Sequence, residues 1–204
     1  MKEVIYITLK RLTDITVSFV GLIVLAPIML IIAILVRATS SGPALYRARR
    51  MGKNKKEFYQ LKYRTMVENA EDLRNADGST LSAKDDPRLT KVGRILRSTS
   101  LDEIPQLWNV LAGAMSLVGP RPDPINVQDL YRPEDYERLS VKPGITGWAI
   151  VHGRNRIPWV QRRDLDLEYI RIRSYWLDIK ILFLTVRMVI FRTGVHAPSS
   201  EDYS

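Results

Sequence analysis

The pattern of hydrophobic and polar residues divides the chain into an apolar N-terminal segment, a mixed central region and an apolar C-terminal segment. In the first segment, no charged residue occurs from Ile15 to Val36. At about 1.5 Å per residue, a helix of this length reaches across the ~30 Å hydrocarbon core of a membrane. Pro27 lies in the middle of the run, where it removes a backbone hydrogen bond and kinks a helix. Hydropathy alone favours a single transmembrane anchor, whereas the proline favours a helix that breaks and turns back.

Basic residues flank this run on both sides. Lys2, Lys10 and Arg11 precede it. The basic residues that closely follow it are Arg37, Arg47, Arg49, Arg50, Lys53, Lys55 and Lys56. Because positively charged flanks stay on the cytoplasmic side of a membrane, we expect both ends of the segment on that side. The sequence therefore predicts a re-entrant membrane helix within residues 1–40.

The C-terminal segment, Trp176 to Val195, is apolar on nearly every side. Its charged residues are Asp178, Lys180, Arg187 and Arg192. Such a helix either joins a core or lies in the headgroup region of a membrane with its Lys and Arg side chains reaching to water. Given the first segment, we favour the membrane interface and assign residues 176–204 to an interfacial helix with a polar tail.

The central region, residues 41–175, has the mixed pattern of a soluble domain, and we expect it on the cytoplasmic side as the region that would hold any catalytic site. Alternating residues predict two strands, Ala44–Arg50 and Phe58–Arg64, joined as a hairpin around Met51–Asn54. Helices are predicted over Val67–Asn75, Leu89–Arg97, Ile104–Leu117, Pro133–Leu139 and Trp159–Ser174, and a glycine-rich turn region over Pro143–Gly153. The expected fold is mainly α with a small β-hairpin, in a monotopic membrane protein.

Composition narrows the possible chemistry. The chain has 31 Lys and Arg against 22 Asp and Glu, a net charge of +9, which indicates an anionic partner such as nucleic acid, anionic lipid or a phosphorylated substrate. The absence of Cys excludes disulfides, thiolate zinc sites and a Cys nucleophile. With only two His residues, a three-His metal site is excluded as well.

Adjacent carboxylates, Asp102 and Glu103, precede the predicted helix that begins at Ile104. Ser100 to Glu103 has the pattern of a capping box, in which both side chains bond backbone N–H groups. The alternative is catalytic, because a helix N-terminus attracts phosphate. A carboxylate there is placed to attack phosphorus or to hold Mg²⁺.

Cations surround this carboxylate pair in the sequence. They are Arg88, Lys91, Arg94 and Arg97 before it and Arg121 after it. A run of charges is commonly just a solvated face, but prolines on both sides hold Arg121, and a rigid guanidinium suits bidentate phosphate recognition. Lys62 and Arg64, on the second predicted strand, either join the same pocket or lie on an exposed face.

Several motifs occur together along nearly the whole chain. They are Lys10-Arg11-x-x-Asp14, Lys62–Met66, Asp85–Thr90, Ser100–Leu107, Asn109–Leu111, Met115–Pro122, Pro143–Trp148 and Gly153–Asn155. In this order and at this spacing they resemble the bacterial sugar transferase family, which comprises monotopic polyprenyl-phosphate phosphoglycosyl transferases. The resemblance is to the minimal catalytic form, without the N-terminal transmembrane module of larger members.

The resemblance implies a re-entrant helix with both ends cytoplasmic and a mostly helical body on the inner leaflet of the bacterial inner membrane. It also implies transfer of a sugar 1-phosphate from a UDP-sugar to polyprenyl phosphate with release of UMP, as the first membrane step of glycoconjugate assembly. In the family, the Asp of the dyad is the nucleophile and Mg²⁺ bridges the dyad and the diphosphate. Asp102 and Glu103 fall on those positions.

The other site residues follow by the same matching. Lys62, Arg97 and Arg121 fall on phosphate-handling positions, and we add Arg64, Arg154 and Asn155 as substrate-binding candidates. Ile150 and His152 stand where Gln and Asn are usual in the family, which affects the expected donor preference more than catalysis.

Two other classes of function are compatible with parts of the sequence. A non-catalytic adaptor that binds anionic lipid would explain the net charge and the apolar segments, but not a carboxylate pair among cations. A nucleic-acid binder has support only in the aromatic and basic residues of Tyr59–Arg64, and the membrane segment argues against it. A glycosyl transferase that moves only the sugar would release UDP instead of UMP.

Overall fold

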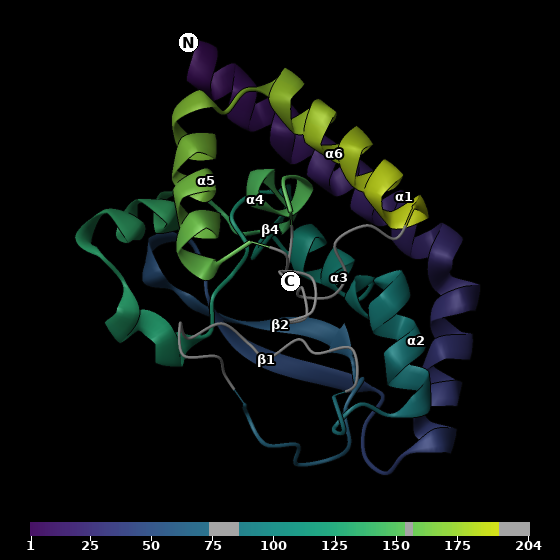
Figure 1. Cartoon of the computed structure of the whole chain (residues 1–204). Coiled ribbons are helices and arrows are strands. Elements are labelled where there is room, and N and C mark those ends of the chain that lie inside the picture. Colours follow the sequence, from purple (N-terminus) through teal and green to yellow (C-terminus); the bar gives the residue numbers. More distant parts are fainter. Residues whose placement is uncertain (74–85, 154–156, 192–204) are drawn as a thin grey trace.

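The computed structural model describes residues 1–73, 86–153 and 157–191 (Figure 1). These residues are mostly helical, and their strands form two two-stranded sheets. The prediction of a mainly α fold with a small β-hairpin is therefore confirmed in its main point. The second sheet was not predicted.

The first helix, α1 (Lys2–Thr39), contains the apolar run and has Pro27 inside it. Figure 1 shows α1 as two arms that meet at a bend, and an internal proline is a common cause of such a bend. Among the described residues, it is the helix long and apolar enough to cross a membrane, and only 17% of its most apolar window is buried. Most of its hydrophobic side chains thus lie on the protein surface.

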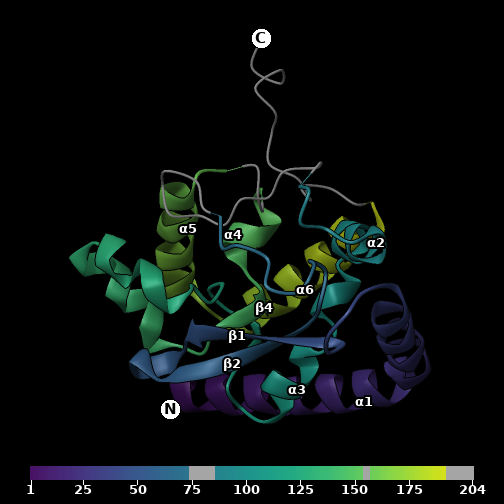
Figure 2. The same cartoon turned by 90° about the horizontal axis from the view of Figure 1, so that it is seen from below.

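Both arms of α1 contact the rest of the protein. In the first arm, Arg11 donates to the carbonyl oxygens of Val110 and Leu111 at 2.7 and 2.9 Å. In the second arm, Ile32 and Val36 are buried in a small cluster that includes residues of the hairpin and α2 (Lys91–Thr99). Figure 2 shows the body lying to one side of the first arm.

The predicted hairpin is confirmed. Strands β1 (Leu45–Met51) and β2 (Glu57–Tyr63) pair antiparallel, with Leu45 opposite Tyr63 and Met51 opposite Glu57. The connection includes a short 3-10 turn, η1 (Lys53–Lys55), in which Asn54 has a positive φ of 56°. Asparagine tolerates this left-handed conformation better than most residues do.

The segment after the hairpin differs from the prediction. Residues 67–73 form turns and irregular structure instead of the first turns of a helix. Thr90 begins α2, since its Oγ1 accepts a hydrogen bond from Gly93 N at 2.8 Å. Gly93 is needed for packing, because a Cβ there would lie 1.9 Å from Thr65 O. The close contact joins α2 to the end of β2.

The predicted helix over Ile104–Leu117 begins within two residues of the predicted start but is wrong at its end. The structure has a 3-10 turn, η2 (Leu101–Glu103), then α3 (Gln106–Leu111) and then strand β3 (Ser116–Val118). Gly113, with a φ of +87°, ends the helical course. The apolar residues Leu117 and Val118, which follow Gly113, belong to a strand that packs in the core. The prediction failed because a short apolar run fits a buried strand as well as a helix.

Strand β3 pairs in parallel with β4 (Gly144–Thr146), inside the predicted glycine-rich turn region. A Cβ on Gly144 would lie 2.2 Å from Gly119 N, so glycine allows the two segments to approach. The remaining elements are η3 (Ile125–Leu130), η4 (Pro133–Ser140), α4 (Trp148–Val151), α5 (Trp159–Ile172) and α6 (Tyr175–Ile190). The predicted helices over 133–139 and 159–174 correspond to η4 and α5.

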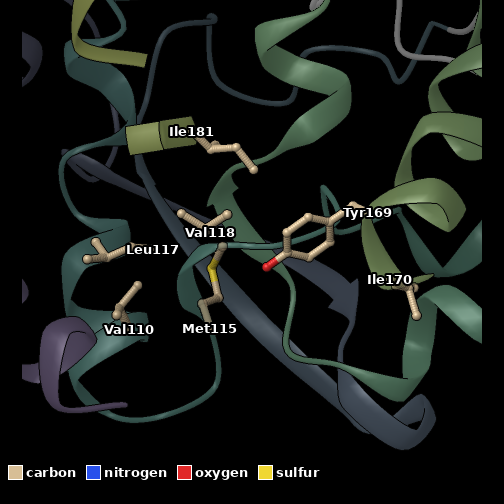
Figure 3. Close-up of a cluster of buried hydrophobic side chains, with 7 residues drawn as sticks. All are labelled: Val110, Met115, Leu117, Val118, Tyr169, Ile170 and Ile181. Atoms are coloured by element: carbon tan, nitrogen blue, oxygen red, sulfur yellow. The ribbon is translucent and has the colours of Figure 1, made fainter. Parts of the chain in front are cut away.

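The main core lies where β3, α3, α5 and α6 meet. Its buried residues are Val110, Met115, Leu117, Val118, Tyr169, Ile170 and Ile181 (Figure 3). Helix α6 contributes Ile181, which is fully buried, while Phe183 and Ile190 are 72% and 68% exposed. The helix therefore packs one side on the core and presents an apolar side outward.

Candidate active site

Asp102 and Glu103 lie in η2, between α2 and α3. Ser100 adopts a left-handed conformation, with a φ of 60°, which ends α2 and redirects the chain. The capping-box prediction is wrong, because no side-chain hydrogen bond caps η2 in the described part of the chain. Since α3 begins only at Gln106, the carboxylates do not sit in its first turn, and tertiary contacts must explain their position.

Glu103 lies between two cations from distant parts of the chain. Its Oε1 accepts hydrogen bonds from Lys62 Nζ at 2.7 Å and from Arg121 Nη2 at 2.8 Å. Lys62 comes from β2, and Arg121 follows β3. The Glu103 and Lys62 side chains are 12% and 16% exposed, so their ion pair is largely shielded from water, whereas the Arg121 side chain is 37% exposed. The negative charge of Glu103 raises the pKa of Arg121.

Asp102 is buried, with 7% of its surface exposed. Burial raises the pKa of the Asp102 carboxyl, and the positive charges of Lys62, Arg97 and Arg121 oppose that rise. Burial also lowers the pKa of Lys62, against the opposing effect of Glu103. Counted as fully ionised, these three cations and two carboxylates have one positive charge in surplus. The cluster is therefore electrostatically suited to an anion.

Arg97 reaches this cluster from α2. Its Nε donates to Thr65 Oγ1 at 3.0 Å, which fixes the guanidinium at the end of the hairpin. Burial lowers the pKa of Arg97, and the nearby charge of Asp102 opposes this. Lys62, Arg97 and Arg121, which the family resemblance singles out, thus come together around the carboxylate pair.

The other basic and binding residues of the prediction have different partners or fall outside the described residues. Arg64 donates from Nη2 to the carbonyl oxygens of Ser40 and Gly42 at 2.9 and 3.1 Å, so it holds the loop after α1. Arg88 is paired with Asp86 at 2.6 Å. Arg154 and Asn155 lie outside the described residues.

Two positions that depart from the family pattern lie in and next to α4. Ile150 is buried, and His152 Nδ1 lies 2.8 Å from the carbonyl oxygen of Trp148. Lys91 and Arg94, the other cations of the predicted cluster, are exposed on α2. The basic residues of the predicted cluster therefore differ in position: Lys91 and Arg94 are exposed, whereas Arg88 is buried against Asp86.

Sequence reasoning missed a supporting residue, Arg138. Its guanidinium pairs with Asp166 at 2.7 Å, pairs with Asp123 and donates from Nη2 to the carbonyl oxygen of Arg121 at 3.3 Å. Burial between these groups raises the pKa of Asp166 to about 6, although Arg138 opposes the shift. In the sequence, Arg138 is one charge in a polar stretch and carries no signal of this role.

Asn109, which belongs to one of the motifs, supports Lys62. Its Nδ2 donates to Tyr59 O and its Oδ1 accepts from Leu61 N, both at 2.8 Å. These bonds fasten α3 to β2 directly before Lys62. The motif Asn109–Leu111 singled out this residue in the sequence, but nothing in the sequence showed that it binds β2.

Comparison with known proteins identifies the family of the chain. The model of the family described as bacterial sugar transferase matches residues 5–192. An uncharacterized sugar transferase of Bacillus subtilis is 43% identical over 187 residues, which cover 92% of this chain and 90% of the relative.

Longer relatives match over the same region. The UDP-glucose:undecaprenyl-phosphate glucose-1-phosphate transferase of Escherichia coli is 44% identical over 186 residues, 87% of this chain and 39% of the relative. The undecaprenyl-phosphate galactose phosphotransferase of Salmonella typhimurium is 39% identical over 199 residues, 92% of this chain and 42% of the relative. The chain spans less than half of these two proteins. On the extent of these matches, the chain belongs to the bacterial sugar transferase family, the family of enzymes that its motifs predicted.

Proposed function

We propose that this protein transfers a sugar 1-phosphate from a UDP-sugar to polyprenyl phosphate. The observation that carries the proposal is the buried carboxylate of Asp102 beside Glu103, within a cluster of surplus positive charge. Relatives named as glucose-1-phosphate and galactose phosphotransferases of undecaprenyl phosphate support the same reaction.

The chemistry proceeds in two displacements at one phosphorus. A carboxylate oxygen of Asp102 attacks the β-phosphorus of the UDP-sugar, and the bond from that phosphorus to the bridging oxygen breaks, so that UMP leaves. A phosphate oxygen of polyprenyl phosphate then attacks the same phosphorus, which releases the Asp102 carboxylate and forms a polyprenyl diphosphate sugar. The covalent aspartyl-phosphosugar intermediate divides the transfer between a soluble donor and a membrane-bound acceptor.

The cations make the first attack possible. A diphosphate repels a carboxylate unless its charge is neutralised, and preorganised cations stabilise the charge that develops in the transition state. Glu103 contributes by holding Lys62 and Arg121 at 2.7 and 2.8 Å. We assign Arg97 to the same phosphate groups.

The carboxylate pair also fits Mg²⁺. No group of three or more His, Cys, Asp or Glu among the described residues is arranged to hold a metal ion. Mg²⁺ usually binds through one or two carboxylates together with substrate phosphates and water, so Asp102 and Glu103 provide a suitable donor set once the diphosphate is present. When bound there, the ion would neutralise phosphate charge.

We propose that α1 is re-entrant, with both ends on the cytoplasmic side of the bacterial inner membrane. Each arm of α1 contacts the same body, since Lys10 bonds α6 through Asp178 and Val36 packs in the cluster of α2. The exposed apolar side chains of α1 and α6 would then lie in the inner leaflet.

The nucleotide released tests the proposed reaction. Purified protein in nanodiscs is mixed with Mg²⁺, polyprenyl phosphate and a panel of UDP-sugars that includes UDP-glucose and UDP-galactose. The proposal predicts UMP as the product and no release by Asp102→Asn. Release of UDP would instead indicate transfer of the sugar alone, and lipid binding without any nucleotide release would favour an adaptor.

A further inference from the structure

The polar residues at the start of α1 bind strand β3. Asp14 Oδ1 accepts hydrogen bonds from Ser116 Oγ at 3.1 Å and from Leu117 N at 2.9 Å. One turn earlier, Lys10 Nζ donates to the carbonyl oxygen of Val118 at 2.9 Å. Side chains of the membrane helix therefore hold all three residues of β3.

These contacts provide hydrogen-bond partners for backbone groups on the edge of β3 that does not face β4. Strand β3 pairs only with β4 among the described strands, and an edge strand leaves backbone groups unpaired. Asp14 takes the place of a further strand for Leu117 N and is itself 3% exposed. A buried acceptor lost from such a site leaves a backbone N–H without a partner.

Lys10 is also held firmly. Its Nζ lies 2.6 Å from Asp178 Oδ2, and its side chain is 18% exposed. Tyr169 donates to the other oxygen of Asp178 at 2.7 Å. A lysine that served only to keep the end of the helix in the cytoplasm would need no partners inside the protein.

Strand β3 leads directly to the site through a stiff connection. Gly119 packs closely against the residues that lead into β4, since a Cβ on Gly119 would lie 2.5 Å from Lys142 O. Pro120 has a fixed φ, and the next residue is Arg121, whose Nη2 binds Glu103 at 2.8 Å. Few torsions are therefore free between the residues that α1 holds and the guanidinium.

We propose that Asp14 and Lys10 are positioning residues for Arg121, so that the membrane helix fixes the place of a phosphate-binding guanidinium through β3. This inference rests on the proposed function for its effect on catalysis. It assigns the polar residues at the start of α1 a role beyond membrane orientation.

The first test compares three variants of the full chain in nanodiscs. Asp14→Ala removes the acceptor, and we expect UMP release to fall by about tenfold to a hundredfold, since small misplacements of a positioned group have effects of this size. Asp14→Asn keeps an oxygen that can accept from Leu117 N and should retain most activity. The matched control is Ser18→Ala, because Ser18 is fully buried on the same helix and its hydroxyl has no hydrogen-bond partner among the described residues.

The second test asks whether Asp14 acts through Arg121. If it does, adding Asp14→Ala to Arg121→Lys should reduce activity by much less than Asp14→Ala does alone. Multiplicative losses, or equal activities for Asp14→Ala and Ser18→Ala, would overturn the proposal. If Asp14→Ala does not fold, Ser116→Ala replaces it, with a smaller loss and the same non-multiplicative pattern expected.

Hydrogen–deuterium exchange gives a readout that does not need activity. Asp14→Ala should increase exchange in peptides covering residues 117–123 and leave those of α5 unchanged. A uniform increase over the body, or no increase over 117–123, would overturn the positioning role. If the wild-type protein releases no UMP, the proposed function fails, and exchange still decides whether Asp14 anchors the loop.

Discussion

Replacing Arg121 by Lys separates guanidinium geometry from positive charge. Arg121 Nη2 donates to Glu103 Oε1 at 2.8 Å, and Arg138 holds the Arg121 carbonyl oxygen at 3.3 Å. Lysine keeps the charge but lacks the planar fork that binds a carboxylate and a phosphate together. The variant should therefore lose activity although the net charge of the site is unchanged.

The size of the loss follows from the contacts that disappear. A hydrogen bond to a charged group contributes about 1.5–3 kcal/mol, and about 1.4 kcal/mol corresponds to a factor of ten in rate. Loss of one such bond therefore predicts a fall in kcat/KM of about tenfold to a hundredfold. Because the Arg121 side chain is 37% exposed, we expect a value in the lower half of this range.

The assay is UMP release at several UDP-sugar concentrations, with melting temperature measured alongside. Arg187→Lys is the control, because Arg187 is exposed on α6, far along the sequence from the site. Its kcat/KM should equal that of the wild type. Equal losses for the two variants, or none in Arg121→Lys, would refute the role of guanidinium geometry.

Two further predictions concern topology and pH. Cysteines placed at the exposed positions Thr8 and Arg47 should be labelled from the same, cytoplasmic side, and labelling from opposite sides would contradict re-entry. Pro27→Leu should shift α1 towards a spanning helix, because it restores the missing backbone hydrogen bond. Activity should show a bell-shaped pH profile: it rises with pH as Asp102, whose pKa is raised, becomes ionised, and falls as Lys62, whose pKa is lowered, loses its proton. Lys62→Arg should move the alkaline limb to higher pH, and an unchanged limb in that variant would show that another group controls it.

Local patterns predicted the elements whose structure depends on local sequence. Alternation of side chains identified the hairpin from Leu45 to Tyr63, and helical periodicity identified α5. Prediction failed where a long-range contact decided the outcome. Met115 continues the helical period of the preceding apolar residues, yet it is buried from a loop that leads into a strand paired with residues 144–146.

In the site, too, local patterns fail where long-range contacts decide the structure. Ser100 and Glu103 have the spacing of a capping box, but Glu103 instead pairs with Lys62, 41 residues away along the chain. Resemblance to the family singled out Lys62, Arg97 and Arg121 as phosphate-handling positions, and the structure places their charges near Asp102. Such a resemblance carries information about tertiary structure that local patterns lack. No pattern in the sequence distinguishes the role of Arg138.

The proposed reaction depends on a covalent bond between Asp102 and the sugar phosphate. The decisive measurement mixes the enzyme with Mg²⁺ and its UDP-sugar in the absence of polyprenyl phosphate, and combines UMP quantification with mass spectrometry of the quenched protein. If Asp102 is the nucleophile, we expect about one equivalent of UMP per enzyme and a sugar-phosphate adduct on the peptide that contains Asp102, with both signals absent in Asp102→Asn. UMP release that requires polyprenyl phosphate, with no adduct under any quench, would contradict it and leave Asp102 as a metal ligand in a direct transfer.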